Sequence, residues 1–219
     1  MKTVGKTELV IIIVAAILMT LLGTIYVVGK KTNKKKVLGF KAAATLVADG
    51  LALLGALQQQ TFASWCIVIG IFLYACADIL LELKFIYGVA CFGIAHLWVI
   101  AGISRKGVTS VVVLLVFLLL FTIALSLFKP YLARLKQLKV PGLIYTAILC
   151  MMSATMFGVL WAGRTWWDLV RAFGSICFVT SDAIIGWNFV NRSKSRTSDI
   201  ILMILYYLAV YLIGLSVVF

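Results

Sequence analysis

Eight apolar stretches, each long enough to cross a lipid bilayer, follow one another along the chain and restrict its fold more than any other feature. About 20 helical residues span the hydrocarbon core, and backbone groups in lipid must pair within their own segment. The period-2 alternation of a transmembrane β-strand is absent from these stretches. We therefore predict an all-α integral membrane protein, a bundle of eight transmembrane helices in a single polytopic domain over residues 1–219. The predicted helices cover residues 9–29, 38–58, 62–82, 85–103, 107–127, 142–162, 165–189 and 199–219.

Composition excludes a soluble domain, because 64% of the residues are hydrophobic and only 12% are charged. The net charge of +13 would suggest nucleic acid in a soluble protein, but the basic residues mostly occupy short links between apolar stretches. Topology and anionic lipid head groups explain such links, so we expect membrane lipids and no nucleic acid as partners. Lysines rather than a small-residue cleavage site follow the first stretch, which predicts a retained helix and not a signal peptide.

The links also predict how the chain is oriented in the cell membrane. An even number of spans places both termini on one side, and positive charge marks the cytoplasmic side. Five basic residues accompany the termini, at positions 2, 6, 105, 106 and 164. Thirteen lie on the other side, at positions 30, 31, 34, 35, 36, 84, 129, 134, 136, 139, 192, 194 and 196. We therefore expect both termini to be non-cytoplasmic.

Several ionisable residues interrupt the apolar stretches. Asp78 and Asp182 lie near the cytoplasmic ends of the third and seventh predicted helices, and Lys41 lies in the first turn of the second. Asp49 shares a helical face with Lys41, and the single histidine, His96, lies deeper in the fourth helix. A charge at the bilayer centre costs about 2.5–3.5 kcal/mol on insertion scales, so such residues are functional candidates. Two structural alternatives stay open: Lys41 could extend to the membrane–water interface, or Lys41 and Asp49 could form a structural pair.

Other acidic residues favour a structural interpretation. Glu82 is expected in a solvated turn at the membrane edge. Asp168 and Arg171 are i, i+3 neighbours, which predicts a local ion pair. Glu8 and Asp199 open helices, where a negative charge favours the N-terminal dipole.

A short internal repeat distinguishes the two membrane-edge aspartates. The segment from Asp78 to Phe85 reads DILLELKF, and the segment from Asp182 to Phe189 reads DAIIGWNF. Both end helices that run in parallel, so we expect two carboxylates to face one cavity in the cytoplasmic half of the bundle. The pattern is short and degenerate, and a chance match is the alternative.

These segments resemble the signatures of the YhhN family, the lysoplasmalogenase-like integral membrane hydrolases. The lysine early in the second helix also matches the family, although Ala42 stands where a proline usually follows, and Ala77 replaces a glycine before the first aspartate. The matching positions are Lys41, Asp78, Phe85, Gly88, Phe92, Ala95, His96, Ser181, Asp182, Asn188 and Phe189. The resemblance covers the whole chain in span order. It implies hydrolysis of the vinyl-ether bond of alkenyl-lysophospholipids to a fatty aldehyde and a glycerophospho-alcohol.

The chemistry of a vinyl ether suits two aspartates. Hydrolysis begins with protonation of carbon, which needs a carboxylic acid, and a carboxylate can then stabilise the cation and activate water. We predict Asp78 and Asp182 as this acid–base pair, with no role assigned to either one. The residues predicted to bind or orient the lysophospholipid or water are Lys41, Asp49, Tyr74, His96 and Asn188. No metal or cofactor is expected, since one histidine is few for a zinc hydrolase, although one His with two Asp is a conceivable ligand set.

Two other function classes remain open. Intramembrane acids and an internal repeat are also found in lipid or small-molecule transporters, but here the acids cluster towards one side and the helices lack obvious Gly or Pro breaks. A hydrolase of the same fold acting on another lysolipid is the second alternative. The sequence predicts neither the head-group preference nor the oligomeric state.

Overall fold

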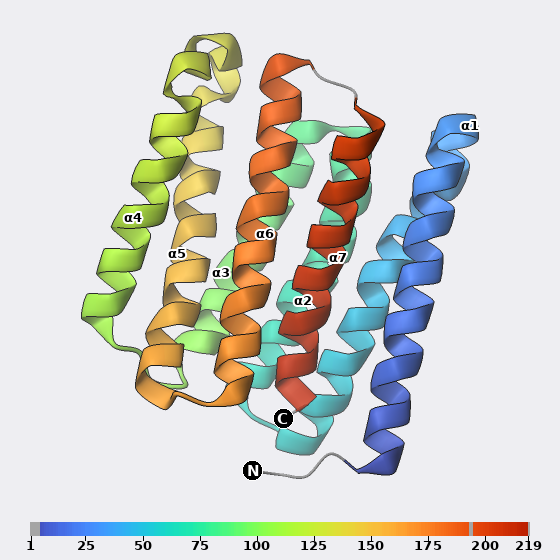
Figure 1. Ribbon diagram of the computed structural model, residues 1–219, viewed down its shortest axis with the longest axis vertical. Coiled ribbons are helices and arrows are strands. Elements are labelled where there is room, and N and C mark those ends of the chain that lie inside the picture. Colours follow the sequence, from blue (N-terminus) through green and yellow to red (C-terminus); the bar gives the residue numbers. More distant parts are fainter. Residues whose placement is uncertain (1–4, 193–194, 219) are drawn as a thin grey trace.

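The computed structural model describes residues 5–192 and 195–218, and within them it is a bundle of helices with no strand (Figure 1). Eight of its helical spans are long and apolar enough to cross a membrane, which confirms the predicted all-α, eight-helix membrane fold. The elements are α1 (Lys6–Gln59), α2 (Phe62–Leu83), α3 (Phe85–Ser104), α4 (Ser110–Phe128), the 3-10 segment η1 (Lys129–Leu138), α5 (Lys139–Gly163), α6 (Trp166–Asn191) and α7 (Arg196–Val218). That they form a single domain stays a prediction.

Helix α1 is a hairpin of two membrane-spanning arms, Lys6–Lys30 and Lys36–Gln59. The backbone leaves the helical region at Asn33, with φ −153° and ψ 91°. The Asn33 side chain accepts a hydrogen bond from the Lys36 amide at 3.2 Å, as an N-cap does at the start of a helix. The arms close tightly because a Cβ on Gly29 would lie 2.5 Å from Val37 Cγ1.

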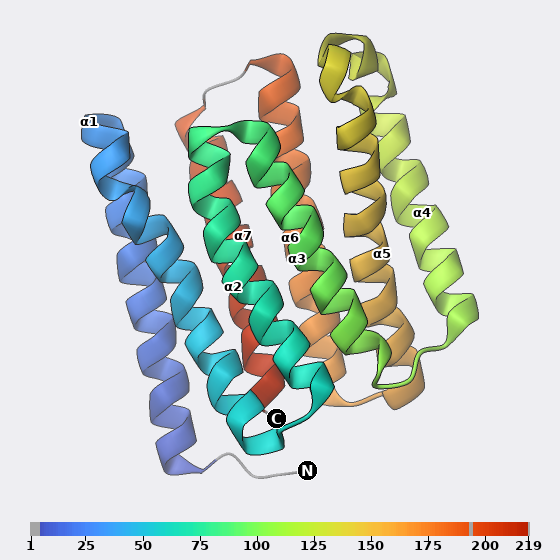
Figure 2. The same ribbon diagram turned by 180° about the vertical axis from the view of Figure 1, so that it is seen from behind.

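Successive spans alternate in direction, so the start of α1 and the end of α7 lie at the same end of the bundle (Figures 1 and 2). The opposite end carries the α1 hairpin turn, the α2–α3 turn, η1, the end of α6 and the start of α7. We call it the basic end, because Lys36, Lys84, Lys129, Arg134 and Arg192 lie there. That the basic end faces the cytoplasm remains a prediction from charge.

The two outermost spans are the first arm of α1 and helix α4, which lie at opposite edges of the bundle (Figures 1 and 2). No residue of α4, a helix that the structure describes throughout, is buried. Its exposed apolar side chains, such as Leu115 and Leu119, therefore face lipid, whereas Leu125 and Phe128 face the bundle. The core lies between the inner helices, where an aromatic cluster of Tyr74, Phe92, Phe178 and Tyr206 is almost fully buried.

Two details of the links were not predicted. The fifth span begins at Ser110 rather than at residue 107, because Gly107 takes a left-handed φ of +84° and the Thr109 amide bonds to the Gly158 carbonyl at 3.2 Å. The link between α4 and α5 is the helical segment η1 rather than an irregular loop.

The end opposite the basic end contains the predicted Asp168–Arg171 pair, which is confirmed at 2.7 Å. Arg171 is nevertheless buried, and it also donates to the Ser216 hydroxyl at 3.0 Å. The pair therefore joins α6 to α7 as well as bracing one helix.

Small residues allow the second arm of α1 to approach α7 closely, as is common between membrane helices. A Cβ on Gly55 would lie 2.4 Å from the Val217 carbonyl oxygen, whereas a Cβ on Gly50 of the same arm would meet nothing within 4 Å.

We predict that Gly55→Ala destabilises the protein by about 1–3 kcal/mol, since backbone of α7 must shift to admit the methyl group. Gly50→Ala is the matched control and should stabilise by up to about 1 kcal/mol through helix propensity. Thermal unfolding in detergent, followed by tryptophan fluorescence, measures both. A midpoint for Gly55→Ala at or above the wild-type value would contradict the close packing.

Candidate active site

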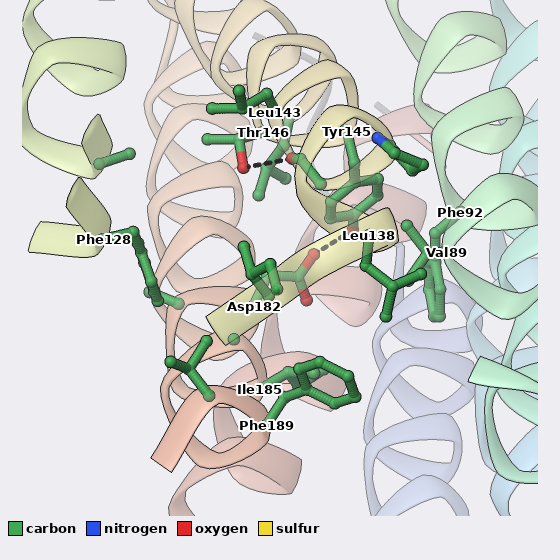
Figure 3. Close-up of a pocket in the computed structure, with 18 of the residues that line it drawn as sticks. Val89, Phe92, Phe128, Leu138, Leu143, Tyr145, Thr146, Asp182, Ile185 and Phe189 are labelled. Atoms are coloured by element: carbon green, nitrogen blue, oxygen red, sulfur yellow. Dashed lines mark hydrogen bonds between the residues drawn. The ribbon is translucent and has the colours of Figure 1, made fainter. Parts of the chain in front are cut away.

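An apolar pocket lies at the side of the bundle between α3, α4, α5, α6 and η1 (Figure 3). Val89, Leu143 and Ile185 are typical of its walls. Among the described residues that line it, Asp182 is the one charged group, and Tyr145 lies beside it. The pocket therefore presents a carboxyl group to an apolar ligand near the basic end.

Asp182 is held by a chain of hydrogen bonds that crosses four helices. Tyr145 of α5 donates to Asp182 Oδ2 of α6, and His96 Nε2 of α3 lies 3.3 Å from the Tyr145 hydroxyl. The chain ends at Tyr74 of α2, whose hydroxyl is 2.6 Å from His96 Nδ1. One consistent direction of donation runs from Tyr74 through Nε2–H of His96 to Tyr145 and on to Asp182. The predicted orienting residues His96 and Tyr74 thus contact Asp182 through Tyr145, which sequence reasoning missed.

Asp78 belongs to a second polar cluster, formed by α1, α2 and α7. Lys41 Nζ lies 3.2 Å from Asp78 Oδ1, and the Thr45 and Tyr206 hydroxyls donate to Oδ2 at 2.6 and 2.8 Å. Asp78 is only 1% exposed. A buried ion pair of this kind needs further hydrogen bonds to offset the cost of desolvation, and the two hydroxyls provide them.

The interpretation of Glu82 as a solvated turn residue is wrong. Its side chain is only 13% exposed, it accepts a hydrogen bond from Tyr26 at 2.6 Å, and it lies 3.8 Å from Lys41 Nζ. Helix α2 continues to Leu83, so Glu82 lies one turn beyond Asp78 on the same helical face. Lys41 therefore faces two carboxylates rather than one.

The two aspartates occupy neighbouring clusters rather than one cavity, which differs from the expectation. The Phe178 ring lies between the clusters, 5.5 Å from the ring of Tyr206 and 4.8 Å from that of His96. The ring centroids of Phe92 and Tyr206 lie 6.0 Å apart, and Phe92 also lines the pocket. We call Phe92 and Phe178 the aromatic wall; Asp182 lies on its pocket side and Asp78 behind it.

The structure places two further predicted residues elsewhere. Asp49 is half-buried, and its Oδ1 has no hydrogen-bond partner within the described ranges. The alternative of a Lys41–Asp49 pair is not realised, because eight residues of helix separate the two by about 12 Å. Asn188 exchanges hydrogen bonds of 2.8 and 3.0 Å with Ser198, which ties α6 to α7.

The ends of the two repeat segments meet in space. The rings of Phe85 and Phe189 stack with centroids 4.4 Å apart and planes inclined by 9°. Both side chains line the pocket. The short sequence repeat therefore corresponds to a spatial pairing at the basic end.

A metal centre has no visible ligand set in the part of the chain that is described. Within residues 5–192 and 195–218, no three His, Cys, Asp or Glu side chains are grouped so as to hold a metal ion. The arrangement at the pocket instead offers proton transfer from or to a carboxyl group, with a tyrosine–histidine–tyrosine chain to support it.

The fold and this site define a polytopic helical membrane protein in which Asp182 is the one acidic group among the described residues that line an apolar pocket near the basic end. The chain belongs to the YhhN family, whose model matches residues 36–217. The match runs from the second arm of α1 to α7 and includes both polar clusters. No curated protein and no solved structure matches the chain.

We predict that Lys41→Met costs about 3–5 kcal/mol of unfolding free energy, since it leaves the buried Asp78 carboxylate without its cation. The double variant Lys41→Met/Asp78→Asn should recover part of this loss, because the charge of Asp78 is removed together with its cation, whereas Glu82 keeps its own charge. Denaturant unfolding in mixed micelles measures the full double-mutant cycle. Equal losses in the single and double variants would show that the ion pair does not stabilise the fold.

Proposed function

We propose that this protein hydrolyses the vinyl-ether bond of alkenyl-lysophospholipids, releasing a fatty aldehyde and a glycerophospho-alcohol. One observation carries the proposal: in a chain of the YhhN family, Asp182 is the one carboxyl group among the described residues that line an apolar pocket near the basic end. The family supports a lysoplasmalogenase-like activity, and the pocket offers a reacting group for it.

The pocket suits an amphiphile with one hydrocarbon chain. Its walls are apolar along most of their extent, and η1 forms part of its boundary through Leu135 and Leu138. The same segment and its flanks carry Lys129, Arg134 and Lys139, which are exposed. A lysolipid would place its chain against the walls and its phosphate among these bases, so its vinyl-ether bond would lie at the level between them. By the positive-inside rule this is the cytoplasmic half of the membrane.

The reaction balances with one water and no cofactor. A carboxylic acid transfers its proton to the outer carbon of the C=C–O group, which leaves a carboxylate and an oxocarbenium-like cation. Water adds to the carbon next to oxygen and gives its proton to a carboxylate, forming a hemiacetal. The hemiacetal then loses its hydroxyl proton as the bond to the glycerol oxygen breaks, and that oxygen takes up a proton.

Both aspartates take part in this proposal, at different distances from the lipid. Asp182 touches the pocket and transfers the proton, in either direction, with the reacting atoms. Asp78 acts from behind the aromatic wall as the second acidic group, and Lys41 serves that aspartate rather than the lipid phosphate. Tyr145, His96 and Tyr74 orient the Asp182 carboxyl group.

We predict that the purified wild-type protein releases aldehyde from an alkenyl-lysophospholipid and that Asp182→Asn lowers the rate by roughly hundredfold or more, the usual scale of acid–base catalysis. Asp78→Asn should also lower it strongly. Asp199→Asn is the matched control, because Asp199 only pairs with Lys30 at the exposed surface, at 3.2 Å.

Each other outcome has a distinct meaning. No aldehyde from the wild type, with consumption of another lysolipid, would replace the substrate and keep a hydrolase. Transport of the lipid across proteoliposomes without any chemical change would favour a carrier. Full activity in Asp182→Asn would contradict the assignment of the pocket.

A second prediction concerns the pocket wall. Val89→Phe fills space that the hydrocarbon chain would occupy, so KM should rise by about tenfold or more, as expected for a few displaced methylene contacts. Leu119→Phe on the lipid-facing surface of α4, where Leu119 is 60% exposed, is the control and should leave KM unchanged. Initial rates in mixed micelles, measured over a range of substrate concentrations, decide between an occupied and an empty pocket.

A further inference from the structure

The sequence repeat around the two aspartates extends much further than the segments that end in Phe85 and Phe189. Tyr145 precedes Asp182 by 37 residues, and Lys41 precedes Asp78 by the same 37. Each of these side chains is the partner that contacts its aspartate from the helix before. Positions 41 and 145 are therefore equivalent. Lys41 contacts Asp78 from the first of them, and Tyr145 contacts Asp182 from the second.

Two more positions obey the same offset of 104 residues. A Cβ on Gly70 of α2 would lie 2.6 Å from Val99 of α3, and a Cβ on Gly174 of α6 would lie 3.1 Å from Leu212 of α7. Each glycine thus permits the close crossing of its helix with the next one along the chain. The small residues before the aspartates, Ala77 and Ser181, are both fully buried.

The order of the helices agrees with a duplication. With the offset of 104, the second arm of α1 corresponds to α5 and α2 to α6, whereas α7, the counterpart of α3 in the order, begins at Arg196, seven residues later than the offset from Phe85 gives. The first arm of α1 then corresponds to α4, and these two are the outermost spans at opposite edges of the bundle (Figures 1 and 2). Each half has four spans, so the halves run in the same direction through the membrane, as parallel repeats do.

We infer that the chain is an internal duplication of a four-helix unit, and that the difference between Lys41 and Tyr145 at one equivalent position makes Asp78 the carboxylate and Asp182 the proton donor. This assignment of roles rests on the proposed function, whereas the protonation states do not. Equivalent acids with unequal neighbours are how a protein divides the acid and base roles of one reaction.

The surroundings of Asp78 favour the charged form. An ammonium group faces it at 3.2 Å, and two hydroxyl groups donate to its other oxygen. The same ammonium lies 3.8 Å from Glu82, to which Tyr26 donates. The lysine lies closer to Asp78 than to Glu82, and together with the two donated hydrogen bonds it favours the charged form of Asp78.

The surroundings of Asp182 favour the neutral form. The groups that contact it directly are the hydroxyls of Tyr145 and Ser181, which carry no charge. His96 contacts it only through Tyr145, and Tyr74 only through His96. The rest of the pocket wall that the structure describes is apolar or uncharged, where an unpaired carboxylate would be costly.

This division of the acid and base roles also leaves the proton of Asp182 facing the bound lipid. Tyr145 occupies Asp182 Oδ2, so a proton on Oδ1 is left for the bound lipid (Figure 3). Once that proton has gone to the vinyl ether, the chain from Tyr74 through His96 and Tyr145 donates toward the new carboxylate. Asp78, behind the aromatic wall, is then a positioning charge that favours the cation without touching it.

Infrared difference spectroscopy of the protein in lipid vesicles at pH 7 tests the assignment through the C=O stretch of protonated carboxyl groups. We expect Asp182→Asn to remove one such band and Asp78→Asn to remove none. Tyr145→Lys should also remove the band, because it places at Asp182 the ammonium that Asp78 already has. Tyr145→Phe, which removes the hydroxyl but adds no charge, is the matched control and should retain it.

A variant with the opposite change, which removes the cation beside Asp78, keeps the test independent of how well the Tyr145→Lys protein folds. Lys41→Met should add a protonated-carboxyl band that is absent from Lys41→Met/Asp78→Asn, since Asp78 loses its cation. A band that disappears in Asp78→Asn, or a spectrum of Asp182→Asn that keeps every band of the wild type, overturns the inference. Aldehyde release measured on the same samples keeps the two proposals apart, because the infrared bands report protonation whether or not the lipid reacts.

Discussion

The constraint on which this structure depends is that a charged side chain within a lipid-embedded bundle must find a partner. Lys41 satisfies this constraint because it faces Asp78 and Glu82. The cluster is completed by three hydroxyl groups from α1 and α7, those of Tyr26, Thr45 and Tyr206. The cluster joins both arms of α1 to α2 and α7. Because one missing partner would leave a buried charge uncompensated, these helices are fixed relative to one another, and the neighbouring aromatic wall is fixed with them.

Against this background Asp182 is exceptional. In the inferred duplication it takes the position equivalent to that of Asp78, yet among the described residues no cation contacts it, and it opens on an apolar pocket. A group of that kind is costly as a bare charge and useful as an acid. On the inference of a duplicated unit, we propose that Asp78 holds the bundle together and that Asp182, which faces the pocket, is available for chemistry.

The fold was accessible from the sequence because span length and charged links depend only on bilayer thickness. The candidate site was accessible only in part. Asp78, Asp182, Lys41 and His96 stand out as polar residues in apolar stretches, whereas Tyr145 and Tyr206 do not, since a tyrosine is ordinary in a membrane helix. Glu82 was misjudged because its location in the cluster depends on Tyr26 and Lys41, which contact it from the two arms of α1. The separation of the aspartates by aromatic side chains depends on helix rotation, which no spacing specifies, although the equal separation of Lys41–Asp78 and Tyr145–Asp182 was present in the sequence as a signal.

The central claim is that a lysolipid reacts at Asp182. An experimental structure with a non-hydrolysable alkyl-ether lysophospholipid bound tests it most directly. We expect the chain of the lipid in the pocket beside Val89 and Leu143, with the first carbons of the ether chain within about 3.5 Å of an Asp182 carboxyl oxygen, as a reacting geometry requires. A lipid bound with its ether group away from Asp182, or with hydrocarbon side chains between the two, would contradict the account.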